Sequence, residues 1–134
     1  HPLCAAAGVA NLELVDSLGL VANARDVGAY FKAALKAALA RSPIVGDIRG
    51  EGLLAAVELS PDPQSGALFD PALKVGPKVA AALLERGVIA RAMPQGDILG
   101  FAPPLCLTRE EADIIVAATE GAIAAAAADL PRKA

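Results

Sequence analysis

The chain has 134 residues, of which 55% are hydrophobic and 3% aromatic, and its formal net charge is −3. This length fits one domain with a core of its own, and the apolar content excludes intrinsic disorder. The charge favours neither nucleic acid nor an anionic membrane surface as a partner. One histidine and two cysteines exclude a zinc framework and a disulfide scaffold. Cys4 and Cys106 stand among apolar residues, so we expect both to be small core residues of a protein from a reducing compartment.

Residues 2–15 are predicted to form a helix that begins at Pro2. The segment is apolar or small on every face, which is typical of a helix buried on all sides. Two interpretations stay open: an internal core helix, or a connector over residues 1–17 that packs on a part of the protein outside this chain. A start at His1 without an initiator Met favours a piece of a longer protein. No apolar run reaches the roughly 18–20 residues of a membrane span, so no membrane partner is expected.

Residues 20–40 are predicted to form an amphipathic helix that ends at Ser42-Pro43. Apolar or small side chains recur at helical spacing on one face, at Leu20, Ala24, Val27, Phe31, Leu35 and Ala38. Two β-rich runs follow, residues 44–52 and 53–59, and the first of them contains three glycines that indicate bends or close backbone approach. A proline-rich loop over residues 60–71 separates them from the second half of the chain.

The second half begins with a helix that Gly76-Pro77 opens and Gly87 ends. Residues 88–92 and 98–101 are predicted to be the two strands of a hairpin, because residues 94–97 have the composition of a turn.

The last helix has a capping box at its start, formed by Thr108 and Glu111, and Pro131 is predicted to end it. The order of elements is then helix, helix, strands, helix, hairpin, helix. This order predicts a single α+β domain over residues 1–134, in which helices cover a small antiparallel sheet.

Most catalytic arrangements are excluded by composition. The histidine of a nucleophile–base pair is missing, because the single histidine is residue 1. Gly50-Glu51-Gly52 is not a dinucleotide-binding fingerprint, since Ala55 stands at the third glycine position. The conspicuous acidic residues all have a structural explanation at a strand end, a turn or a cap, namely Asp47, Glu58, Asp97 and Glu111.

Arg91 is the candidate for chemistry that the residues themselves provide. It stands at the end of an apolar strand just before the hairpin turn. A guanidinium group binds a carboxylate through two parallel hydrogen bonds, so a strand-end arginine beside a cleft can orient an acidic substrate. Spacing alone favours the alternative that Arg91 points to water or pairs with Asp97. Arg49 is a similar but weaker candidate.

Four sequence motifs occur in order along the chain. They are His1-Pro2 with Ala10-Asn11, VGDIRGEGLL at 45–54, ERGVIAR at 85–91, and Gly96-Asp97-Ile98 followed by APPL at 102–105. Together they resemble the class III pyridoxal-phosphate-dependent aminotransferases, and within that family the omega-aminotransferase branch. The resemblance implies the C-terminal small domain of a fold-type I enzyme, joined to a large domain that lies outside this chain.

For function, the resemblance implies an enzyme that moves an amino group between an amine or omega-amino acid and a keto acid such as pyruvate. Arg91 matches the family's arginine that pairs with the substrate carboxylate and swings out for an amine. The Schiff-base lysine matches no position here, since Lys74 and Lys78 stand in other motifs. We therefore expect the chain alone to be inactive and not to hold pyridoxal 5'-phosphate.

The resemblance further implies a homodimer or higher homo-oligomer in the cytoplasm. An alternative from another class is a stand-alone module for dimerisation or interaction, without enzymatic activity.

Overall fold

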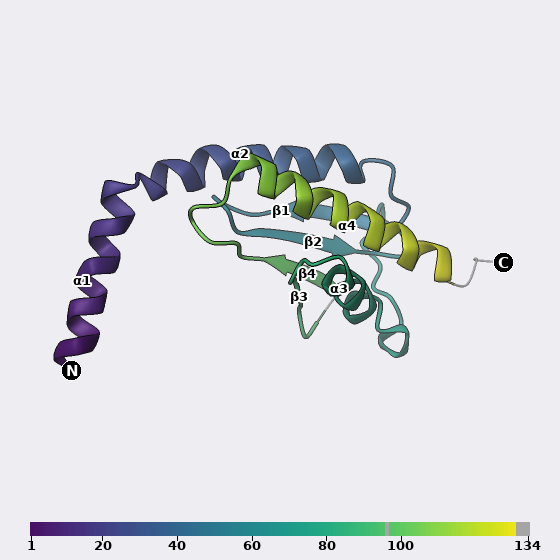
Figure 1. The fold of residues 1–134 in the computed structure, drawn as a ribbon. Helices are drawn as coiled ribbons and strands as arrows, with labels where there is room; N and C mark the ends of the chain where they lie inside the picture. Colours follow the sequence, from purple (N-terminus) through teal and green to yellow (C-terminus); the bar gives the residue numbers. More distant parts are fainter. Residues whose placement is uncertain (96, 131–134) are drawn as a thin grey trace.

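The structure is a computed structural model that describes residues 1–95 and 97–130 (Figure 1). Along the chain the elements are α1 (Pro2–Ser17), α2 (Leu20–Leu39), β1 (Val45–Arg49), β2 (Ala55–Leu59), the 3-10 helix η1 (Pro71–Leu73), α3 (Val75–Glu85), β3 (Arg91–Ala92), β4 (Ile98–Phe101) and α4 (Arg109–Asp129). The predicted α+β class is confirmed. The prediction that Pro131 ends the last helix lies outside the described residues.

The four strands form one antiparallel sheet in the order β1-β2-β4-β3. Side chains alternate along β2, where Ala55, Val57 and Leu59 are buried while Ala56 and Glu58 are only half-buried. This period of two gives the sheet a helix-covered face and an open face. The open face carries Arg49, Ala56, Glu58, Ile98, Gly100 and Arg91. The register of β1 against β2 shifts between Val45 and Asp47, which is a β-bulge.

The core lies between the helix-covered face and the helices α2, α3 and α4. Phe31 of α2 is fully buried and meets Phe101 of β4 edge-to-face, with ring centroids 6.1 Å apart. The predicted apolar stripe of α2 is confirmed at its centre, where Val27, Phe31 and Leu35 are buried. The helix thus forms because its apolar stripe matches the inner face of the sheet.

Polar contacts on the surface join α2 to α4 and to the loop before it. Tyr30 donates a 2.6 Å hydrogen bond to Asp113, which raises the pKa of Tyr30, and the Arg109 guanidinium lies over the Tyr30 ring. Asn23 donates to the carbonyls of Leu105 and Leu107 at 2.7 and 3.0 Å. These bonds hold the second half of the loop that connects β4 to α4 against α2.

Local capping signals are confirmed in the second half of the chain. Thr108 accepts a hydrogen bond from the Glu111 amide, and the Glu111 carboxylate accepts one from the Thr108 amide, as a capping box requires. Gly87 has a φ of 79° and follows α3, where its amide bonds to the Leu84 carbonyl. The Val88 amide bonds to the Leu83 carbonyl, which completes a Schellman motif.

The strand predicted over residues 88–92 is shorter than expected. Only Arg91 and Ala92 pair with β4. The amide of Val88 is used to close α3, and Ile89 is 86% exposed, so this part of the segment connects the helix to the sheet. The predicted hairpin itself is confirmed, since β3 and β4 pair antiparallel.

The prediction that the two cysteines are core residues is wrong. Cys4 and Cys106 are both exposed. Cys4 lies on α1, which has no buried residue, and Cys106 lies in the loop before α4. Apolar neighbours in sequence did not imply burial, because α1 buries none of its residues and, beside Cys106, it is Leu107 that enters the core.

Helix α1 extends away from the rest of the molecule (Figure 1). None of its residues is buried, and Leu3 and Leu12 are 73% and 67% exposed. The interpretation as an internal core helix is therefore wrong for this chain. Among the described residues no single helix has the length and hydropathy of a membrane span, and α1 and α2 reach them only as a pair bent by 60°.

Because α1 exposes apolar side chains on every face, we expect the isolated chain to self-associate through it. The mass from light scattering should then rise with protein concentration, and removal of residues 1–17 should restore a monomer. A wild-type chain that stays monomeric at high concentration would contradict this expectation.

Candidate functional site

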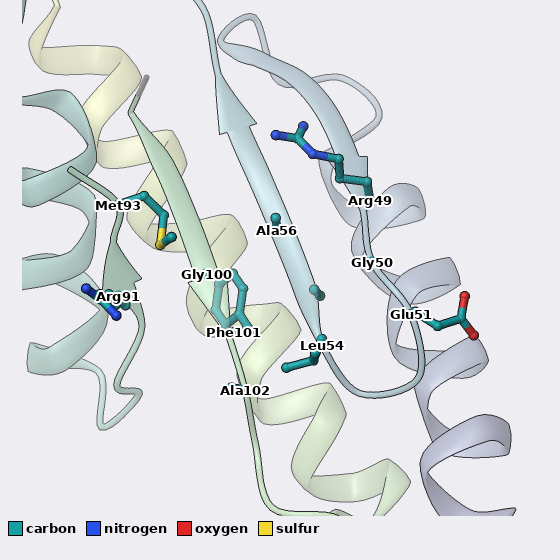
Figure 2. Close-up of a pocket in the computed structure, with 11 residues that line it drawn as sticks. Arg49, Gly50, Glu51, Leu54, Ala56, Arg91, Met93, Gly100, Phe101 and Ala102 are labelled. Carbon is teal, nitrogen blue, oxygen red and sulfur yellow. The ribbon is translucent and has the colours of Figure 1, made fainter. Parts of the chain in front are cut away.

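The open face of the sheet carries a row of four residues in register across all four strands (Figure 2). From β1 to β3 the row runs Arg49, Ala56, Gly100 and Arg91. Three interstrand spacings of about 4.8 Å place the backbones of the two arginines roughly 14 Å apart. Two cationic side chains therefore flank a middle that is nearly free of side-chain atoms.

This row borders a shallow depression with a volume of about 570 Å³, which we call the Arg91 depression. Besides the row, its walls include Leu54, Met93 and Ala102, and Glu51 lies at its rim (Figure 2). The depression exists because Ala56 and Gly100 have so little side chain. Its surface combines apolar walls with two guanidinium groups, which suits an organic anion.

The two arginines differ in their partners. Arg49 bonds to Asp47 at 2.8 Å and to Glu58 at 2.6 Å. Both hydrogen bonds raise the pKa of Arg49 above its ordinary value. The bond to Asp47 has the larger effect and the bond to Glu58 the next largest. One positive and two negative charges leave a net charge of −1 on this cluster. The Arg49 side chain is thus used in structural ion pairs, which agrees with the prediction that it is a weaker candidate than Arg91 for binding a substrate.

Arg91, by contrast, has no carboxylate within ion-pair distance in residues 1–95 and 97–130, and its side chain is exposed. Of the two predicted alternatives, exposure of Arg91 to water is what the structure has, and pairing with Asp97 does not occur, since the Asp97 carboxylate accepts a 2.7 Å hydrogen bond from the Gly76 amide. Arg91 therefore presents an unpaired guanidinium group at the depression. Its role in substrate binding stays a prediction.

Asp97 holds the hairpin that carries Arg91, a role that the sequence did not reveal. Its side chain caps the first turn of α3 at Gly76, and its carbonyl accepts a 3.2 Å bond from the Leu59 amide at the end of β2. Asp97 also has a φ of 45°, in the left-handed region. The turn thereby links α3 and β2 to the start of β4, the strand that pairs with the Arg91 strand.

The lining residues of the Arg91 depression do not fit pyridoxal phosphate as a covalent partner. An imine needs a lysine amine, and none lies among the described residues that line the depression. Lys74 lines a different depression, with Phe69 and Pro94. No group of three His, Cys, Asp or Glu side chains capable of holding a metal occurs in the described part of the chain.

The profile of the family described as aminotransferase class-III matches residues 1–123. The chain therefore belongs to the class III aminotransferases, and the resemblance seen in its motifs is confirmed.

Several relatives illustrate this membership. The chain is 58% identical over 123 residues to a diaminobutyrate–2-oxoglutarate transaminase of Halomonas elongata, covering 92% of this chain and 26% of the relative. A solved transaminase obtained by ancestral reconstruction superposes with a TM-score of 0.95 at 53% identity, covering 98% of this chain and 29% of that one. An (S)-enantioselective omega-transaminase from Thermomicrobium roseum superposes with a TM-score of 0.87 at 37% identity, covering 94% and 28%.

The chain thus spans only about a quarter to less than a third of the length of these relatives. Its fold is that of one part of a transaminase. Family membership favours the enzyme interpretation over a stand-alone interaction module.

Proposed function

We propose that this chain is the C-terminal portion of a pyridoxal-phosphate-dependent transaminase. The whole protein would move an amino group between an amine or omega-amino acid and a keto acid such as pyruvate. The family match over residues 1–123 and the transaminases among its structural neighbours support this proposal. The observation that carries it is the unpaired Arg91 beside an apolar depression, because a keto acid brings a carboxylate that needs a cationic partner.

Arg91 is suited to serve substrates with and without a carboxylate. It lies on an edge strand of only two paired residues, and no acidic partner among the described residues restrains its side chain. For a keto acid the guanidinium binds the carboxylate. For a simple amine it turns to solvent and leaves the apolar walls to the substrate, which costs little because the side chain is already exposed.

The cofactor would be held by residues outside this chain. When bound, pyridoxal phosphate supplies the electron sink for amino transfer. The part of the enzyme described here binds and orients the substrate carboxylate. We further propose that α1 is the connector that packs on a large domain, and that the whole protein is a cytoplasmic homodimer or higher homo-oligomer.

The full-length protein, loaded with pyridoxal phosphate, provides the test. Incubation with 1-phenylethylamine or β-alanine as donor and pyruvate as acceptor should yield alanine in a one-to-one ratio with the carbonyl product. Failure to transfer an amino group from any amine or amino acid to any keto acid would contradict the proposal.

The chain alone should behave differently from the whole protein. We expect it to form no stoichiometric lysine aldimine with pyridoxal phosphate and to show no transaminase activity, because the depression has no lysine among its described lining residues. An absorbance scan after gel filtration checks this expectation. A stoichiometric aldimine band that survives gel filtration would refute it.

A further inference from the structure

We propose that Ala56 and Gly100 determine substrate specificity by leaving room for the part of the substrate that is attached to the carboxylate. Monocarboxylates in which this part is flat and apolar are favoured. This inference rests on the proposed role of Arg91 as carboxylate partner. We call Ala56 of β2 and Gly100 of β4, which lie between the two arginines of the row, the floor of the Arg91 depression.

The strand pairing indicates where the rest of a molecule would lie when Arg91 binds its carboxylate. Gly100 is the cross-strand partner of Arg91, and Ala56 is the partner of Gly100. A carboxylate that Arg91 holds over the open face would therefore have the backbone of β4 beside it and that of β2 one strand further on. Leu54 and Met93 border the same surface, so an aliphatic chain or an aromatic ring can cover an apolar floor (Figure 2).

The two floor residues are small, and the structure leaves room for a larger side chain at Gly100. A Cβ added at Gly100 would lie 3.4 Å from the Met93 sulfur and 3.7 Å from the Arg91 carbonyl oxygen, which is ordinary van der Waals contact. A larger side chain can therefore be built at Gly100 without a clash in the core, because it extends from the open face into the depression. Glycine at this position keeps that volume available for ligand.

The end of the row opposite Arg91, at Arg49, differs in its charge. Arg49 is bound by both Asp47 and Glu58, and this cluster carries a net charge of −1. A second carboxylate that reached across the floor would meet Arg49, whose charge Asp47 and Glu58 already compensate, and the Glu51 carboxylate at the rim. An apolar end meets no such repulsion, so the depression discriminates against dicarboxylates of the same length.

The test is a binding series on the 134-residue chain, whose core is closed by its own sheet and helices, so no cofactor or turnover is needed. The titrations use protein concentrations at which light scattering shows a monomer, so that association through α1 does not contribute. NMR titrations would follow the amides of Ala56, Gly100 and Arg91 with 4-phenylbutyrate, hexanoate, adipate and propionate. We expect 4-phenylbutyrate to bind about tenfold more tightly than propionate, because the ring adds apolar contact. Hexanoate should bind more tightly than adipate.

Variants separate the floor from the anchor. Gly100→Val should weaken binding of 4-phenylbutyrate severalfold and leave propionate unchanged, while Arg91→Ala should weaken both. The matched controls are Gly8→Val, where an added Cβ has no neighbour within 4 Å, and Arg41→Ala, outside the depression; both should bind like wild type.

Three outcomes would overturn the proposal: no saturable binding of 4-phenylbutyrate, equal binding by Gly100→Val, or tighter binding of adipate than of hexanoate. These outcomes can be distinguished from failure of the proposed function. If the full-length protein is a transaminase that depends on Arg91 but Gly100→Val does not change binding, the proposed function holds and the role of the floor is wrong. If the binding series gives the expected order but the full-length protein transfers no amino group, the role of the floor holds and the proposed function is wrong.

Discussion

Replacing Gly28 with alanine is expected to lower the free energy of unfolding by about 3 kcal/mol or more. Gly28 is buried on α2, where the backbone of Gly52 passes directly over it. An added Cβ would overlap the carbonyl group of Gly52 and lie 2.9 Å from its Cα. Backbone cannot rotate aside as a side chain can, so the loop between β1 and β2 would have to leave the helix.

Helix propensity acts in the opposite direction, since alanine is favoured over glycine by about 1 kcal/mol within a helix. The steric overlap is the larger effect. Denaturant unfolding followed by circular dichroism measures the difference. The matched control is Gly8→Ala on α1, where the added Cβ has open space. That variant should be at least as stable as wild type, because only the gain in helix propensity acts at Gly8. A Gly28→Ala chain of unchanged stability would refute the close packing.

Replacing Arg91 with alanine in the full-length enzyme is expected to raise KM for keto-acid and amino-acid substrates about tenfold or more. A charged hydrogen bond contributes roughly 1.5–3 kcal/mol, and each 1.4 kcal/mol is a factor of ten in affinity. The half-reaction of an amine without a carboxylate should change little, because that substrate has no group for the guanidinium. Arg91→Lys should restore little, since an ammonium group lacks the planar fork.

Single-turnover kinetics of the two half-reactions make this comparison. Arg41→Ala serves as the control, an arginine removed outside the Arg91 depression. If Arg91→Ala slowed both half-reactions equally, the residue would act in folding or packing, and its assignment as the carboxylate partner would be wrong.

Local signals in the sequence predicted much of this fold. The capping box of Thr108 and Glu111 and the stop at Gly87 involve residues a few positions apart, so their geometry follows from the sequence itself. The α2 stripe was recognisable for the same reason, since its period is a property of one helix. Arg91 was also singled out, because it ends an apolar strand before a turn and because it stands in the family's ERGVIAR motif.

The features that were missed depend on contacts between distant segments. The row from Arg49 to Arg91 needs the register of three strand pairs, and that register is set by which strand faces share the core. The role of Asp97 depends on its meeting Gly76, 21 positions earlier. The exposure of Cys4 depends on α1 having no packing partner in this chain, which composition cannot reveal.

The bulge between Val45 and Asp47 affects how the protein behaves when crowded with copies of itself. β1 is an outer strand of the sheet, and its backbone would otherwise offer a template for a strand of another molecule. The irregular register and the charged side chains of Asp47 and Arg49 make that edge a poor template. At the opposite edge, β3 offers only two residues. Fibril-like growth by strand addition is therefore disfavoured at both edges, and aggregation of this chain should proceed through its helical surface instead.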